Sequence, residues 1–190
     1  MVDFMGGKFA ALARRLMQAR ALRRFARRQD GVAAIEFGLV ALPFLMLIFA
    51  IMETALVFFA GQTLETAVAD SARLIMTGQA QQQGFNQQAF KDAVCSRVFG
   101  LFDCASGVYV DVKTYTNFAD VNMSQPLDAN GNFVNDFTYQ PGCPGSIVVV
   151  RLFYQWPIAL SSLGLSNMSN GKRLLVATSA FRNEPYASTC

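Results

Sequence analysis

The stretch that decides the fold is Gly31–Phe59, GVAAIEFGLVALPFLMLIFAIMETALVFF. Its segment Val32–Met52 carries a single charge, that of Glu36. At about 1.5 Å of rise per residue this segment forms a helix about 31 Å long, which matches the ~30 Å hydrocarbon core of a bilayer. A secretory signal peptide has a shorter apolar region and a small-residue cleavage site soon after it. The stretch therefore predicts a transmembrane helix.

The charge on either side of this helix predicts its orientation. Residues 1–31 contain eight basic and two acidic residues, a net charge of +6, whereas the rest of the chain contains eight basic and eleven acidic residues, a net charge of −3. Because positively charged flanks stay in the cytoplasm, we expect a single pass with a cytoplasmic N-terminus and an exported remainder. The basic segment is either a solvated leader or an amphipathic helix on the inner leaflet. Beside a membrane span, it does not indicate nucleic-acid binding.

All four cysteines, Cys95, Cys104, Cys143 and Cys190, follow the helix and are predicted to lie in an oxidising compartment. Four cysteines allow three pairings, of which we favour Cys95–Cys104 and Cys143–Cys190. In the chain-entropy model these loops are worth about 2.7 and 4 kcal/mol. Zinc binding is the alternative, but the chain has no histidine and no CxxC pair. We expect no metal and no other cofactor.

The long helix is predicted to continue beyond the membrane. Apolar residues recur at three- and four-residue spacing up to about Thr77, and Gly78 is a suitable stop. We therefore expect a basic cytoplasmic leader (1–31), a transmembrane half of the N-terminal helix (32–59) and an exported head (60–190). The residues predicted to face the head are Leu64, Ala67, Val68, Ser71, Leu74 and Ile75.

The head is predicted to be of the α+β class. Residues 79–84 read as a polar spacer, and a second short helix is expected from an Asn86 cap to about Phe99. Three β-rich runs follow, 107–116, 146–155 and 172–182, and predict an antiparallel sheet against the long helix. In the first run Val108, Val110 and Val112 share one face, and Asp111 and Lys113 share the other.

Two connections in the head invite functional interpretations. The loop 117–145 is long enough to be functional or mobile. Within it an Asn-Gly turn and a calcium site are competing readings, although Gly131 is misplaced for an EF-hand and the closing Glu is missing. The oxygen-bearing residues are Asp128, Asn130, Asn132 and Asp136. The connection 156–170 either offers a small apolar patch to a partner or covers the edge of the sheet.

Glu36 is an unusual residue because a carboxylate inside a membrane helix costs up to ~2.5–3.5 kcal/mol. Cleavage of the chain after Gly31 supplies a partner, since the new α-amino group of Val32 is cationic and lies near Glu36. The same amine is available to Glu36 of a neighbouring subunit, and such a pair sets the axial register of packed helices. The alternative is an interfacial carboxylate in a signal anchor that is never cut.

A glycine, four residues, then Glu and an aromatic residue resembles the prepilin pattern of the Flp (type IVc, tight-adherence) pilus. Phe37 stands where Tyr is usual, which changes only the hydrogen bonding of the aromatic residue. With a head that major Flp pilins lack, the chain resembles a TadE-like minor pseudopilin; TadG-type relatives usually carry larger domains. The resemblance covers the helix with its Pro43, the cysteine-bearing middle, and the terminal run 181–186, FRNEPY.

This resemblance implies a pilin-like α+β fold and cleavage by a prepilin peptidase at Gly31 and Val32. It implies Glu36 and Phe37 as the processing and assembly motif, and an inner-membrane protein with a periplasmic head that can also enter a pilus. Implied partners are the peptidase, the major Flp pilin, other minor pseudopilins and the inner-membrane Tad assembly platform, besides membrane lipid. Pro43 is expected to kink or loosen the helix.

The leading functional prediction is therefore a minor pseudopilin in Flp pilus assembly for surface adherence. We expect no enzyme, because the sequence has no histidine, no GxSxG and no glycine-rich phosphate loop. The alternative is an uncleaved membrane-anchored protein that binds or senses a ligand through its exported head.

Overall fold

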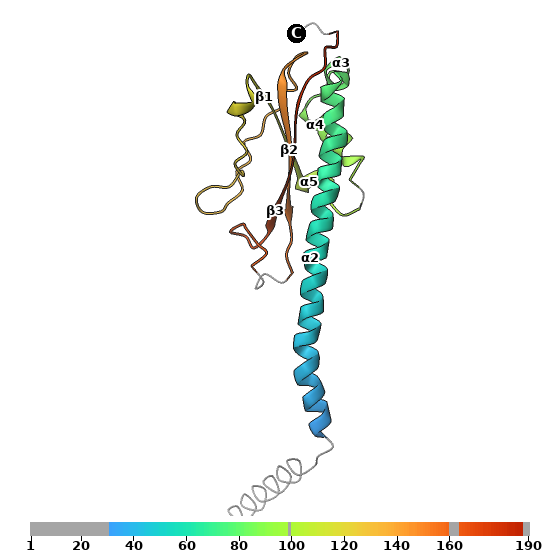
Figure 1. Ribbon diagram of the computed structural model, residues 1–190, viewed down its shortest axis with the longest axis vertical. Coiled ribbons are helices and arrows are strands. Elements are labelled where there is room, and N and C mark those ends of the chain that lie inside the picture. The colour runs from blue at the N-terminus through green and yellow to red at the C-terminus, as the bar shows by residue number, and fades with distance from the viewer. Residues whose placement is uncertain (1–30, 99, 160–163, 188–190) are drawn as a thin grey trace, which may run out of the picture. The chain divides into compact units, whose positions relative to one another are not determined.

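The computed structural model describes residues 31–98, 100–159 and 164–187 (Figure 1). The predicted leader therefore lies outside the described residues, except for Gly31. The chain divides into two compact units between Phe49 and Ala50. Helices and an antiparallel sheet confirm the predicted α+β class. The elements are α2 (Val32–Met76), α3 (Gln79–Gln82), α4 (Gln87–Cys95), α5 (Cys104–Gly107), β1 (Val108–Tyr115), η2 (Phe118–Asp120), β2 (Ile147–Trp156) and β3 (Arg173–Arg182).

Helix α2 ends where the sequence loses its helical preference. Its last residue is Met76, one residue before the predicted end, and Gly78 follows in the left-handed region with φ +78°. Gly78 donates its N–H to the carbonyl of Ile75 at 3.0 Å, which closes the last turn. Pro43 lies inside α2, and the helix is continuous through it. The kink near Pro43 stays a prediction.

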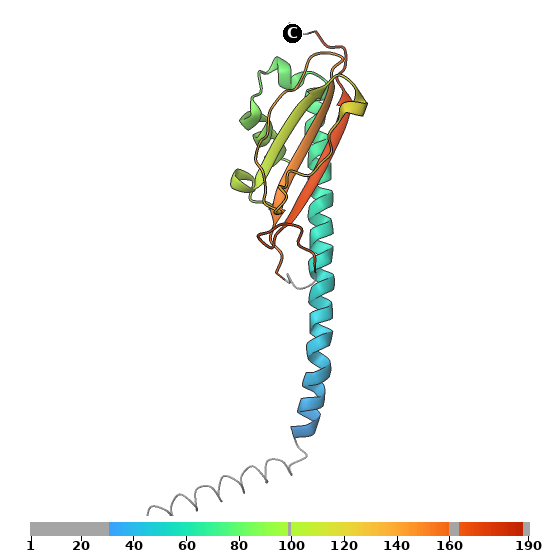
Figure 2. The same ribbon diagram turned by 90° about the vertical axis from the view of Figure 1, so that its left-hand side faces the viewer.

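The three strands form one sheet in the order β1-β2-β3, and both pairs are antiparallel, as predicted. In the register, Val110 faces Leu152, and Leu152 faces Ala177. The predicted strand bounds lie within one residue of the observed ones at each end. Apolar residues alternate in β1, whereas β2 is a largely apolar run that is buried on both faces. Figure 2 shows the three strands side by side.

The inner face of the sheet packs on the part of α2 that belongs to the second unit, and on α4 (Figure 1). The predicted positions Leu64, Ala67, Val68, Ser71 and Ile75 are all buried in this helix, and Leu74 is half-buried. They meet one face of each strand, which places the main core of the head between helix and sheet. The most buried residues of this main core are Ala60, Leu64, Ile75, Phe90, Val94, Val108, Val112, Val148, Val150 and Leu152.

The segment between β1 and β2 covers the outer face of the sheet. Two backbone hydrogen bonds join this segment to β1 at Val112. The N–H of Val112 donates to the carbonyl of Thr138, and the N–H of Gln140 donates to the carbonyl of Val112, both at 2.8 Å. A second apolar cluster lies beneath this segment. The long loop is therefore a packed third layer, a role that the sequence alone did not predict. The cluster consists of Phe153, Met168 and Leu174 with Tyr109, Leu127, Phe133, Phe137 and Val176.

The short helices differ in part from expectation. Asn86 is the N-cap of α4, as predicted, and its side chain accepts the N–H of Ala89 at 2.8 Å. However, α4 ends at Cys95 instead of about Phe99. The expected polar spacer 79–84 contains the single turn α3. Ala80 in α3 and Val98 after the end of α4 are both buried in the main core.

Candidate membrane helix and processing site

The N-terminal part of α2 exposes its apolar side chains. From Val32 to Phe49 nearly every residue is exposed, with Phe37 at 74% and Leu39 at 72%. Among the described residues α2 is the one helix long and apolar enough to cross a membrane. An apolar surface of this size is stable only when lipid or protein covers it. The structure thus supports membrane anchoring through α2.

The predicted processing residues lie at the start of this helix. Gly31 directly precedes α2, and Val32 is its first residue. Val32 and Glu36 are four residues apart and so share a helix face, with Cβ atoms about 5–6 Å apart. Glu36 is exposed between exposed Ile35 and Phe37. A carboxylate and an apolar surface are therefore presented together at this end of α2.

Glu36 is not part of an ion pair within the described residues. The two ion pairs there both involve Asp111, which lies in the head. The carboxylate is therefore accessible to a cation from outside those residues, such as an α-amino group.

Glu53, the next charged residue along α2, contacts the head. Its carboxylate accepts the backbone N–H of Ala159, which follows β2. One turn further on, Val57 and Ala60 are buried in the main core, whereas Phe58 is 69% exposed on the other side of the helix. Among the described residues, contact between α2 and the head therefore begins near Glu53, and Phe58 on the opposite face of the helix is exposed.

The terminal run FRNEPY fastens the far end of α2 to the sheet. The N–H of Glu184 donates to the carbonyl of Met76 at 2.9 Å and so caps α2. The buried Asn183 side chain donates to the carbonyls of Pro141 and Cys143, at 2.9 and 3.1 Å. The ring of Tyr186 lies where a Cβ on Gly78 would stand. The sequence singled out this run by resemblance, and gave no signal of its capping role.

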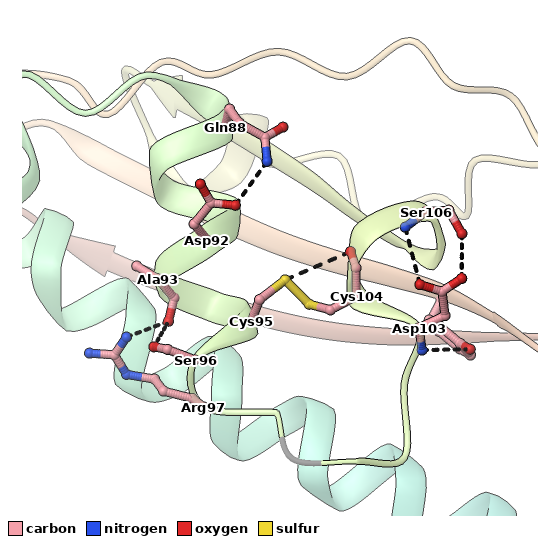
Figure 3. Close-up of a disulfide and its surroundings, with 10 residues drawn as sticks. Gln88, Asp92, Ala93, Cys95, Ser96, Arg97, Asp103, Cys104 and Ser106 are labelled. Atoms are coloured by element: carbon pink, nitrogen blue, oxygen red, sulfur yellow. Dashed lines mark hydrogen bonds between the residues drawn. A yellow bond between two sulfur atoms is a disulfide. The ribbon is translucent and has the colours of Figure 1, made fainter.

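One predicted disulfide is confirmed. Cys95, at the end of α4, is bonded to Cys104, the first residue of α5, with Cα atoms 5.7 Å apart (Figure 3). The predicted Cys143–Cys190 pair lies outside the described residues, because Cys190 does. The Cys95–Cys104 bond holds α5 and the start of β1 near α4.

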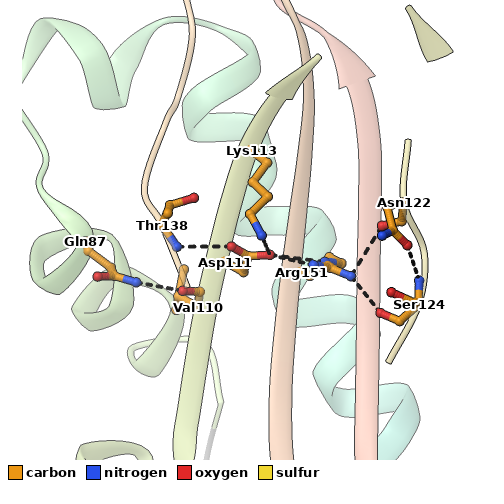
Figure 4. A network of polar contacts seen from close by, with 8 residues as sticks. All are labelled: Gln87, Val110, Asp111, Lys113, Asn122, Ser124, Thr138 and Arg151. Carbon is orange, nitrogen blue, oxygen red and sulfur yellow. Dashed lines mark hydrogen bonds and ion pairs between the residues drawn. The ribbon is translucent and has the colours of Figure 1, made fainter. Parts of the chain in front are cut away.

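The outer layer is held by a buried ion pair. Asp111 on β1 and Arg151 on β2 are direct cross-strand partners, and their Oδ2 and Nη2 atoms are 2.7 Å apart (Figure 4). Arg151 Nη1 also donates to the carbonyl of Ser124, at 3.0 Å, and Asp111 Oδ1 accepts the N–H of Thr138. Asp111 is on the face opposite the valines, as predicted, but the segment 117–145 buries it.

Three of the four residues of the alternative calcium interpretation, Asp128, Asn130 and Asn132, form a turn. Asp128 Oδ1 accepts the N–H groups of Asn130 and Asn132, both at 2.8 Å, and Oδ2 accepts the Asn132 amide. These hydrogen bonds, above all that from the Asn132 side chain, lower the pKa of Asp128. Gly131 has φ +77° and donates to the Asp128 carbonyl, as an Asn-Gly turn requires. The Asp128 carboxylate is thus engaged by the turn itself.

Comparison with protein families gives one match, to the model of the TadE-like protein family over residues 31–73. The matched segment begins at the glycine before α2 and ends in the last turn of that helix. No curated protein and no solved structure matches the chain. The match confirms the predicted resemblance and supports a part in this pilus system in association with pilus components. Over residues 31–73 the chain is thus similar to the TadE-like protein family, and this similarity supports a TadE-like protein of the Tad/Flp pilus system.

Proposed function

We propose that this protein is a minor pseudopilin that a prepilin peptidase cuts after Gly31 and that takes part in assembly of the Flp pilus for surface adherence. The observation that carries the proposal is the exposed Glu36 carboxylate, one helical turn into an exposed apolar helix that starts directly after Gly31. The family match starts at the same glycine.

Cleavage after Gly31 supplies a positive charge that compensates the Glu36 carboxylate in the membrane. The new α-amino group of Val32 is a cation at the end of the same helix face, and in a bundle of helices it pairs with Glu36 of a neighbouring subunit. In lipid an unpaired carboxylate is costly, so the paired register is favoured over every shifted one. Phe37, exposed beside Glu36, completes the motif that the peptidase and the neighbouring helices meet.

The role is structural and not catalytic. Before assembly the protein is held in the inner membrane by α2, with its leader in the cytoplasm and its head in the periplasm. Its partners are the prepilin peptidase, the major Flp pilin, other minor pseudopilins and the Tad assembly platform. Pro43 loosens one turn of α2, which eases the passage of the helix from bilayer to pilus.

The assembly role is tested by Glu36→Ala, with Glu65→Ala as the matched control. Glu65 is the same residue type on the same helix, exposed, and bonded only to Gln62 among the described residues. We expect Glu36→Ala to leave the amount of protein in the membrane unchanged while the yield of sheared pili falls, and Glu65→Ala to change neither. Normal piliation with Glu36→Ala contradicts the role assigned to Glu36.

Processing is tested separately with a bulky residue at Gly31. Among the described residues, apart from the chain neighbours, no atom lies within 4 Å of a Cβ built at Gly31, so a side chain can be introduced there, as in Gly31→Leu. We expect the uncut precursor to accumulate in the membrane, seen as a heavier band on immunoblots. Normal processing of this variant shows that the peptidase does not read Gly31.

A further inference from the structure

We propose that the end of the head containing Trp156 docks in the outer headgroup layer of the phospholipid bilayer. The docking surface is Phe58, Phe59, Trp156, Pro157 and Lys172. This inference rests on the proposed function, because it takes α2 to span the membrane.

The apolar surface of α2 is longer than the hydrocarbon core. Exposed apolar side chains continue as far as Phe59, and the helix from Val32 to Phe59 is about 42 Å long at about 1.5 Å per residue. The hydrocarbon core is about 30 Å thick, and the bilayer with both headgroup layers about 40–45 Å. The surplus apolar length therefore fits the headgroup layers, with Phe58 and Phe59 in the outer one.

The head reaches the same depth. Ala159 donates its backbone N–H to Glu53, which is six residues before Phe59 and so about 9 Å nearer to the membrane centre. Trp156 precedes Ala159 by three residues and lies within about 11 Å of it. The end of β2 and the residues just after it thus lie at the level of the outer membrane surface.

Trp156 has the environment of an interfacial tryptophan. It is half-buried, and one side packs on Phe102 and Tyr154, with ring centroids 5.9 and 6.1 Å away. Pro157, the next residue, is exposed. Tryptophan favours the membrane interface because its ring is apolar and its N–H is polar. The exposed part of Trp156 is therefore suited to the carbonyl and headgroup region.

Charge at this end of the sheet fits phospholipid phosphates. Arg173 is the cross-strand partner of Trp156. Lys172 directly precedes Arg173 in the sequence. Arg173 Nη1 is bonded to the carbonyl of Leu165 at 2.9 Å, whereas Lys172 is exposed. The nearby Glu53 carboxylate is engaged by the head. Together with the apolar surface that continues from the span, this cation favours lipid as the occupant over a soluble protein.

The chain contains one tryptophan, so its own fluorescence reports the depth of the docking surface. The full chain is reconstituted in vesicles of phosphatidylethanolamine and phosphatidylglycerol that carry a nitroxide either on the headgroup or near the end of the acyl chain. We expect a larger loss of Trp156 emission with the headgroup nitroxide than with the deep one. Lys172→Glu should reduce that loss, whereas Arg182→Glu, the same charge change at the other end of β3, should not.

A second probe separates this inference from the proposed function. In a Trp156→Phe background, Leu45→Trp places the fluorophore in the predicted span, and the deep nitroxide should quench it more strongly. If Leu45→Trp behaves so while Trp156 is quenched by neither nitroxide, the head does not dock and this inference is wrong, but the span stands. If Leu45→Trp is not quenched, the membrane span fails, and the proposed function fails with it. Equal effects of Lys172→Glu and Arg182→Glu contradict the orientation assigned to the head.

Discussion

Asp111 and Arg151 face each other across β1 and β2 and form an ion pair that the outer layer buries, with side chains 1% and 10% exposed. Arg151 also lies over the ring of Phe153, 5.3 Å from its centroid. The pair therefore joins the sheet, the segment that covers it and the second apolar cluster. Loss of Asp111 leaves the buried guanidinium of Arg151 without an opposite charge.

We expect Asp111→Asn to lower the free energy of unfolding by about 3–5 kcal/mol, because Arg151 stays buried without its carboxylate. Asp70→Asn is the control, since Asp70 is exposed on α2, and it should change stability by less than about 0.5 kcal/mol. The measurement is denaturant unfolding in detergent micelles, followed by Trp156 emission. The double variant Asp111→Leu/Arg151→Met should recover most of the loss; equal losses for Asp111→Asn and Asp70→Asn contradict this account.

The contact between the end of α2 and the terminal run 181–186 predicts that alanine substitution of two glycines, Gly78 and Gly84, lowers stability by different amounts. Gly78 and Gly84 both have positive φ, +78° and +65°. A Cβ on Gly78 would lie 2.4 Å from Tyr186 Cγ. A Cβ on Gly84 would have no atom of the described residues within 4 Å, apart from its chain neighbours. Gly84→Ala should cost about 1–2 kcal/mol for its backbone alone, and Gly78→Ala about 2–5 kcal/mol because overpacking is added. Equal costs in the same unfolding assay show that Tyr186 does not pack there.

Alkaline pH should destabilise the head through Tyr139. Burial raises the pKa of Tyr139 to about 12, and its hydroxyl has no hydrogen-bond partner among the described residues. Because the pKa is higher in the folded than in the unfolded state, the protonated form favours folding. This contribution is complete below about pH 10 and is lost as the pH rises toward 12.

The check on Tyr139 is the pH dependence of the melting temperature. Tyr139→Phe should flatten the fall between pH 10 and 12 without lowering stability at neutral pH, since no hydrogen bond is lost. Part of the fall should persist, because burial also raises the pKa of Tyr186. An unchanged profile in Tyr139→Phe means that another group titrates.

Removal of the Cys95–Cys104 disulfide should cost about 2.7 kcal/mol in the chain-entropy model for a loop of this length. The double variant Cys95→Ser/Cys104→Ser is compared with the oxidised protein by denaturant unfolding. Asp103, which caps α5 by accepting the N–H of Ser106, should keep that turn in place. Unchanged stability in the variant shows that α4 and α5 are held by their packing alone.

Local sequence patterns were sufficient to predict the three strands and the end of α2. The strand bounds are predicted within one residue because valines alternate in β1 and because β2 and β3 are runs rich in β-forming residues. The end of α2 is predicted because Gly78 suits a left-handed conformation. The pairing of Cys95 with Cys104 was accessible because the two are near each other in sequence. In each case the deciding interaction is short in sequence or repeats with the period of the element.

The outer layer was missed because its cause is not local. Phe133 and Phe137 have no periodic pattern around them, and their burial depends on Phe153 in a strand that follows later in the chain. Asp111 reads as a solvent-facing residue until Arg151 is placed opposite it. The capping of α2 by Glu184 joins residues more than a hundred positions apart, which no sequence window reports. The apolar run of α2, in contrast, is contiguous in sequence and is predicted directly, and the proposed processing residues Gly31 and Glu36 lie at its start.

The central claim, that Glu36 is matched by an amine freed at Val32, is tested most directly by mass analysis of the N-terminus of protein from the native membrane and from sheared pili. With an active prepilin peptidase, the account predicts a chain that begins at Val32. Pili that assemble normally while every copy of the protein keeps the arginine-rich segment before Gly31 would contradict it.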